Sequence, residues 1–125
     1  MNLLLDTHAL LWWLADDGRL SKDAREVISK PKNTVFVSAA SAWEISIKRA
    51  LGKLEAPENL TVAVSTSGFK ELGITIEHAL AAGQLPDHHM DPFDRMLVAQ
   101  ATIESLTVVT RHAWIVSYQI PTIRA

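Results

Sequence analysis

The feature that most constrains the fold of this sequence is the alternation of short apolar runs with segments of helical pattern. The runs at 3–5, 35–37, 74–76 and 107–109 are predicted to be short buried strands. A fifth strand is predicted at 120–123, at a sheet edge because Pro121 has no backbone N–H to donate. Helices are predicted between the strands, at about 8–15, 22–29, 39–54, 60–68, 77–83 and 92–105.

Strands that alternate with helices are typical of an α/β protein whose parallel sheet is covered on both faces. The apolar runs do not alternate with polar residues, which agrees with burial on both sides. We therefore predict a three-layer α/β/α fold with a small parallel sheet of four to five strands. The 125 residues, 48% of them hydrophobic and 21% charged, fit a single domain over 1–125.

The composition excludes some chemistry. The chain has no cysteine, so it has no disulfide, thiol nucleophile or thiolate metal site, and a metal must be held by carboxylates, histidines or backbone oxygens. The formal net charge of −2 excludes a bulk polyanion binder, although not a local nucleic-acid site. Apolar stretches are too short to cross a membrane, so we expect a soluble cytoplasmic protein.

Acidic residues stand where a parallel sheet binds ligands, beyond the carboxyl ends of its strands. Asp6 follows the first strand, Glu44 lies in the helix after the second, and Asp91 and Asp94 begin the helix that leads into 107–109. We expect them to share one edge of the sheet. Carboxylates crowded together must take up a proton or share a cation, and oxygen ligands favour Mg²⁺ or Mn²⁺. Such a site suits the cleavage of phosphodiesters.

Each acid also has a structural interpretation. Asp6 and Asp91 are good helix N-caps, and Asp94 in the first turn suits the helix dipole. Glu44 completes a capping-box pattern that begins at Ser41, and it forms an i, i+4 pair with Lys48 worth about 0.2–0.5 kcal/mol.

We expect the histidines and tryptophans of this sequence to have mainly structural roles. His78 is expected to be a solvated helix residue, and His8 to lie near the cleft. The pair at 88–89 lacks the spacing and the third ligand of a metal site. The four tryptophans are expected in the core or at an interface rather than under nucleobases: Trp12, Trp13, Trp43 and Trp114.

Three ordered segments resemble PIN-domain proteins, and more closely the VapC toxins of bacterial type II toxin–antitoxin pairs. They are Leu3–Trp12 (LLLDTHALLW), Ser38–Lys48 (SAASAWEISIK) and Asp91–Ala101 (DPFDRMLVAQA). The closing segment at 106–111 also fits, so that the resemblance covers essentially the whole chain.

The resemblance implies a PIN-like fold and an endoribonuclease that hydrolyses RNA phosphodiester bonds with Mg²⁺ or Mn²⁺ and an activated water. It also implies a small antitoxin protein as inhibitor and a homodimer. The catalytic and metal-binding acids fall on Asp6, Glu44 and Asp94. Accessory residues are Asp91, Thr7, Ser38, Lys48, Thr110 and His112. Arg95 and Arg111 are candidates for phosphate contact, for pairing with the acids, or for simple solvation.

One position departs from the family pattern. His112 stands where the family usually has a fourth acid after Thr-Arg. It can ligate Mn²⁺, contact phosphate or play no part. The alternative function is therefore a catalytically weakened PIN-fold module that binds RNA or protein. An aspartyl-phosphate phosphatase is disfavoured, because His8 stands where that chemistry needs a second aspartate.

Overall fold

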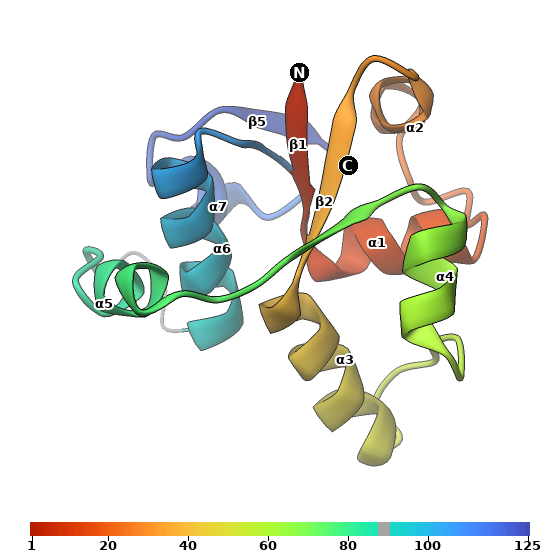
Figure 1. Ribbon diagram of the computed structural model, residues 1–125, viewed down its shortest axis with the longest axis horizontal. Helices are drawn as coiled ribbons and strands as arrows, with labels where there is room; N and C mark the ends of the chain where they lie inside the picture. Colours follow the sequence, from red (N-terminus) through yellow and green to blue (C-terminus); the bar gives the residue numbers. More distant parts are fainter. Residues whose placement is uncertain (88–90) are drawn as a thin grey trace.

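A computed structural model describes residues 1–87 and 91–125 as a parallel five-stranded sheet with helices on both faces (Figure 1). The strands, in the spatial order β3-β2-β1-β4-β5, all run parallel. Their bounds are β1 Asn2–Leu5, β2 Thr34–Ser38, β3 Lys70–Leu72, β4 Thr107–Thr110 and β5 Thr122–Arg124. The predicted α/β/α class is confirmed.

The helices follow the predicted ranges closely. They are α1 Thr7–Leu14, α2 Lys22–Ser29, α3 Ala39–Ala50, α4 Leu60–Thr66, α5 Ile76–Gly83, α6 Pro92–Glu104 and α7 Ala113–Val116. Within the described residues, no helix is long and apolar enough to cross a membrane.

Strand β1 occupies the centre of the sheet, and its leucines are completely buried. Leu3 and Leu5 pack into the core on one face with α1 and α2, whereas Leu4 packs into the core on the other face with α6. An unbroken apolar run suits this strand because both of its faces meet helices.

The register of the central strands brings their carboxyl ends to one level. Leu5 pairs with Val37 of β2 and with Val109 of β4. The next residue, Asp6, continues the ladder by donating its backbone N–H to the Val109 carbonyl at 3.1 Å. As a result, the first residues after β1 and β4 and the start of α3 lie at the same edge of the sheet.

Residues with a positive φ follow the C-terminal ends of two helices. Helix α3 ends at Ala50 rather than near 54, and Gly52 just beyond it has φ 71°, a conformation that glycine adopts without a Cβ penalty. Helix α6 ends at Glu104, and its C-cap Ser105 has a left-handed φ of 57°.

The strand predicted at 74–76 is wrong. The third strand in sequence is Lys70–Leu72, which pairs with Phe36–Ser38. Ile74 and Ile76 are exposed, and Thr75 between them is the N-cap of α5. The true strand is a short, exposed edge strand, so it carries no apolar run to mark it. The edge strand predicted at 120–123 is present but displaced to Thr122–Arg124, and the short helix α7 was not predicted.

Candidate active site

Asp6 links the end of β1 to the start of α1. One carboxylate oxygen, Oδ1, accepts the backbone N–H of Ala9 at 2.8 Å, and so Asp6 is the N-cap of α1 as expected. The other, Oδ2, accepts the hydroxyl of Thr110 from the end of β4 at 2.6 Å. Burial raises the pKa of the Asp6 carboxyl, although both hydrogen bonds and the nearby His112 and His8 oppose that rise.

Glu44 reaches the same edge from α3 and is buried. Its Oε1 accepts the Thr7 hydroxyl at 2.6 Å, and its Oε2 pairs with Lys48 Nζ at 2.5 Å, which confirms the predicted i, i+4 pair. That hydrogen bond raises the pKa of Lys48. The predicted capping box from Ser41 does not form, because Ser38 caps α3 and Ser41 lies inside the helix.

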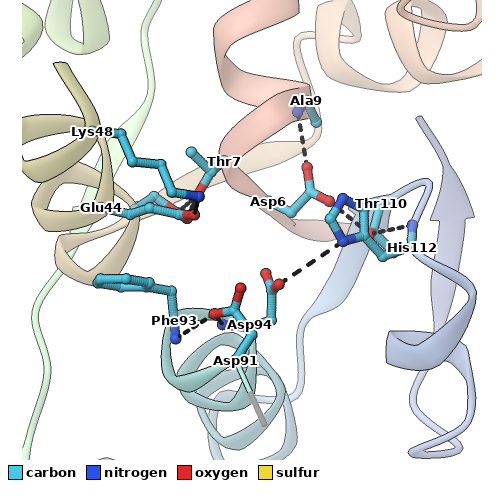
Figure 2. A network of polar contacts seen from close by, with 11 residues as sticks. Asp6, Thr7, Ala9, Glu44, Lys48, Asp91, Phe93, Asp94, Thr110 and His112 are labelled. Carbon is cyan, nitrogen blue, oxygen red and sulfur yellow. Dashed lines mark hydrogen bonds and ion pairs between the residues drawn. The ribbon is translucent and has the colours of Figure 1, made fainter. Parts of the chain in front are cut away.

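Asp91 and Asp94 stand at the start of α6. Asp91 Oδ1 accepts the N–H of Phe93 at 2.9 Å and of Asp94 at 3.2 Å, which confirms it as an N-cap. Asp94, in the first turn of α6, is buried, and its carboxyl group points toward His112 and Asp6 (Figure 2).

Four carboxyl groups thus approach one another from three parts of the chain, and we call Asp6, Glu44, Asp91 and Asp94 the carboxyl cluster. Burial, followed by the charges of Asp91, Asp6 and Glu44, raises the pKa of Asp94 to about 8. Crowded carboxylates relieve their repulsion either by binding a proton or by sharing a cation.

The ligand atoms that the carboxyl cluster offers are carboxylate oxygens, with hydroxyl groups beside them. Such oxygen ligands are the kind that a hard divalent cation prefers. Among residues 1–87 and 91–125, no three His, Asp or Glu side chains are already arranged as a closed ligand set. A cation would have to draw the carboxylates closer together than their present hydrogen bonds hold them.

His112 lies beside the cluster, after β4. Its Nδ1 is 3.8 Å from Asp94 Oδ2, and its backbone N–H donates to the Thr110 hydroxyl at 3.0 Å (Figure 2). The imidazole therefore occupies one side of the cluster, where the sequence pattern of the family places an acid.

Three other predicted site residues are engaged elsewhere. The Ser38 hydroxyl donates to Gln100 Oε1 at 2.6 Å. Arg95 donates to the backbone carbonyls of residues 82, 85 and 86, and Arg111 donates to the carbonyls of residues 19 and 125. Both guanidinium groups thus tie loops and chain segments together, and their contact with phosphate stays a prediction.

Two buried polar residues were not foreseen. Gln100 is fully buried and joins Ser38 to the Gly73 carbonyl, and nothing in the local pattern of α6 marks it. His78 was expected to be solvated, which is wrong: it is buried, completes a capping box with Thr75 and contacts Glu104. Thr75 three residues before it was the available signal. The histidines at 88–89 lie outside the described residues.

Fold and site together define a class: an α/β protein with a carboxyl cluster at the carboxyl edge of a parallel sheet, the position at which such folds bind ligands.

Comparison with known proteins narrows this class. The family model of the PIN domain matches residues 3–112. The chain is 31% identical to the ribonuclease VapC22 of Mycobacterium tuberculosis, over 96% of this chain and 94% of that protein. It is also 48% identical to ribonuclease VapC16 of the same organism, over 32% of this chain and 31% of that one.

Solved structures share the fold. A chain of the VapBC2 complex from Rickettsia felis, crystallised with a DNA fragment from its promoter, superposes with a TM-score of 0.71 at 15% identity, covering 98% of both chains. A chain of a toxin–antitoxin complex from Klebsiella pneumoniae gives a TM-score of 0.67 at 17% identity, over 98% of this chain and 96% of that one. The protein belongs to the PIN domain family.

Proposed function

We propose that this protein is the toxin of a toxin–antitoxin pair and acts as a metal-dependent endoribonuclease; its VapC relatives are named ribonucleases. The observation that carries the proposal is the carboxyl cluster, in which burial and then the neighbouring negative charges raise the pKa of Asp94 to about 8. An active site that binds Mg²⁺ or Mn²⁺ explains why a fold would keep four carboxyl groups together at this edge.

Asp6, Glu44 and Asp94 are the proposed metal ligands and catalytic residues, with Asp91 as an accessory acid. When bound, a divalent cation supplies Lewis-acid chemistry: it lowers the pKa of water and offsets charge on the leaving oxygen. Attack by water at phosphorus breaks the bond to the 3′ oxygen and leaves a 3′-hydroxyl and a 5′-phosphate.

The protein's own contribution is to hold the carboxylates in position. Thr110 and the Ala9 amide fix the two oxygens of Asp6, while Thr7 and Lys48 fix those of Glu44. Asp91, by capping α6, fixes the first turn from which Asp94 projects. These contacts orient the individual carboxylates at the edge of the sheet, from which a cation would draw them together.

The proposed partners are RNA as substrate, a small antitoxin protein, and a second copy of the chain, with residues 1–125 acting as one domain in the cytoplasm. The solved relatives include toxin–antitoxin complexes, which supports the antitoxin. Exposed apolar side chains follow one another at one-turn spacing along α3 and its C-cap, and they form a surface of the kind that a protein partner covers: Trp43, Ile47 and Leu51.

The test is cleavage of a pool of cellular RNAs by purified protein in Mg²⁺, Mn²⁺ or chelator, with the cut ends mapped. We expect cleavage with either metal, none in chelator, and none with folded Asp6→Asn protein. Unchanged cleavage by Asp6→Asn would refute the assignment.

A second candidate is a PIN-fold module that binds RNA or protein and has lost most of its catalysis, which His112 beside Asp94 favours. The variant His112→Asp separates the two. A large gain in cleavage over an almost inactive parent would support the binding module, whereas equal activity would support the enzyme.

A further inference from the structure

Four aromatic side chains form a row beside the carboxyl cluster, and we call them the ring row. Two come from α1 and two from the segment after β4. The ring centroids of His8 and His112 are 5.6 Å apart, those of His8 and Trp12 are 5.9 Å apart, and those of His112 and Trp114 are 5.2 Å apart. The order along the row is therefore Trp12, His8, His112 and Trp114.

The ring row crosses the edge of the sheet. Trp12 packs partly against the core on one face, and Trp114 packs partly against the core on the other face. Between them, His8 is exposed and His112 is half-buried. Core packing accounts for the outer sides of the two tryptophans but not for two histidine rings placed side by side in contact with solvent.

One end of the ring row is covered by two guanidinium groups. The guanidinium groups of Arg111 and Arg19 lie 4.6 Å and 5.5 Å from the centroid of the Trp12 ring. Arg19 pairs with Asp17 at 2.7 Å, and Arg111 donates to the Ala125 oxygen at 3.0 Å. These cation–π contacts hold the Trp12 ring in place at this end of the ring row.

The middle of the ring row touches the carboxyl cluster, because His112 Nδ1 lies 3.8 Å from Asp94 Oδ2. A nucleotide whose phosphate lies at the cluster has its neighbouring bases within reach of these rings. Unpaired bases stack on aromatic side chains with little regard to sequence, whereas the faces of bases in a duplex are already covered by one another.

We propose that the ring row is a stacking platform for unpaired RNA bases next to the phosphodiester that is cut, an inference that rests on the proposed ribonuclease function. It gives His8, which touches no acid of the cluster by hydrogen bond, a role in binding the RNA.

The test measures binding of a fluorescent single-stranded oligoribonucleotide at low salt in chelator, so that cleavage does not interfere. We expect His8→Ala to weaken binding about 5- to 150-fold, the range that corresponds to the loss of one stacked base. His8→Phe, which keeps a ring, should bind within about threefold of the parent. Leu80→Ala, which truncates an exposed apolar side chain on α5, is the matched control and should bind as the parent does.

A second measurement removes bases instead of rings. In a series of oligonucleotides with one abasic site each, one position should weaken binding to the parent but not to His8→Ala, because the same contact is then already lost. The inference is overturned if a blunt duplex of the same sequence binds as tightly as the single strand, if His8→Ala binds as the parent does, or if the two losses are additive at every position.

The outcomes separate this inference from the proposed function. If cleavage requires a metal and Asp6 but His8→Ala binds RNA as the parent does, the ribonuclease function is supported and the stacking platform is refuted. If RNA binding depends on the bases and on His8 but no cleavage occurs in Mg²⁺ or Mn²⁺, the stacking platform is supported and the enzymatic function is refuted.

Discussion

Replacing Asp94 by asparagine should change how the stability of the metal-free protein depends on pH. Burial and the charges of Asp91, Asp6 and Glu44 raise the pKa of Asp94 to about 8 in the folded protein. In the unfolded chain the same group has a pKa of about 3.9. Between these two pH values, the folded protein holds a proton that the unfolded chain has released.

The sign of the effect follows from this difference. Because the folded state binds the extra proton, the free energy of unfolding falls as pH rises through this window, and the stabilisation is fully present only below the unfolded pKa. The slope for one proton is at most about 1.4 kcal/mol per pH unit. Raising the pH from 5 to 7 therefore removes up to roughly 3 kcal/mol through Asp94. Asparagine cannot ionise, so Asp94→Asn should lose this part of the slope.

The assay is urea unfolding of the parent and of Asp94→Asn at pH 5, 6, 7 and 8 in chelator, followed by tryptophan fluorescence. Asp6, whose pKa is also raised, contributes to the slope that remains. The matched control is Asp23→Asn, which removes an exposed carboxylate on α2 and should keep the parent's slope.

Saturating Mg²⁺ or Mn²⁺ should raise the parent's stability most at pH 7–8, because the cation replaces the proton of Asp94, and should raise that of Asp94→Asn far less. Identical pH slopes for the parent and Asp94→Asn in chelator would show that neighbouring charges do not hold a proton on this carboxyl.

Three further predictions concern single contacts. Thr7→Val removes the hydroxyl that donates to Glu44 and should lower metal affinity or cleavage about 10- to 100-fold, while Thr7→Ser should retain both, as measured by calorimetry and RNA cleavage. Leu97→Ala leaves a cavity at a fully buried position in the core around α6 and should destabilise the protein by about 2–5 kcal/mol, measured by urea unfolding. A loss of stability below about 1 kcal/mol would contradict the packing described. Ser105→Gly relieves a left-handed φ of 57° and should stabilise by up to about 1 kcal/mol, whereas Ser67→Gly, at an ordinary helical φ of −73°, should not stabilise.

Local patterns in the sequence predicted most of the fold, because helix starts and buried strands depend on neighbouring residues. Asp91 followed by Pro92 marks the start of α6, and the leucines at 3–5 mark the central strand. The prediction failed where an element has no apolar signature, as at the edge strand Lys70–Leu72, and where polar groups are buried through distant contacts, as for His78.

The sequence by itself determined the α/β class, the acidic residues at the strand ends and their order along the chain. Only the tertiary structure decided how those acids are held. Thr110 binds Asp6 across 104 positions of the sequence, and Thr7 binds Glu44 across 37. Such contacts depend on the register of parallel strands, which no local pattern encodes. The same holds for the ring row, since rings from α1 and from the segment after β4 meet only because β1 and β4 are neighbours in the sheet.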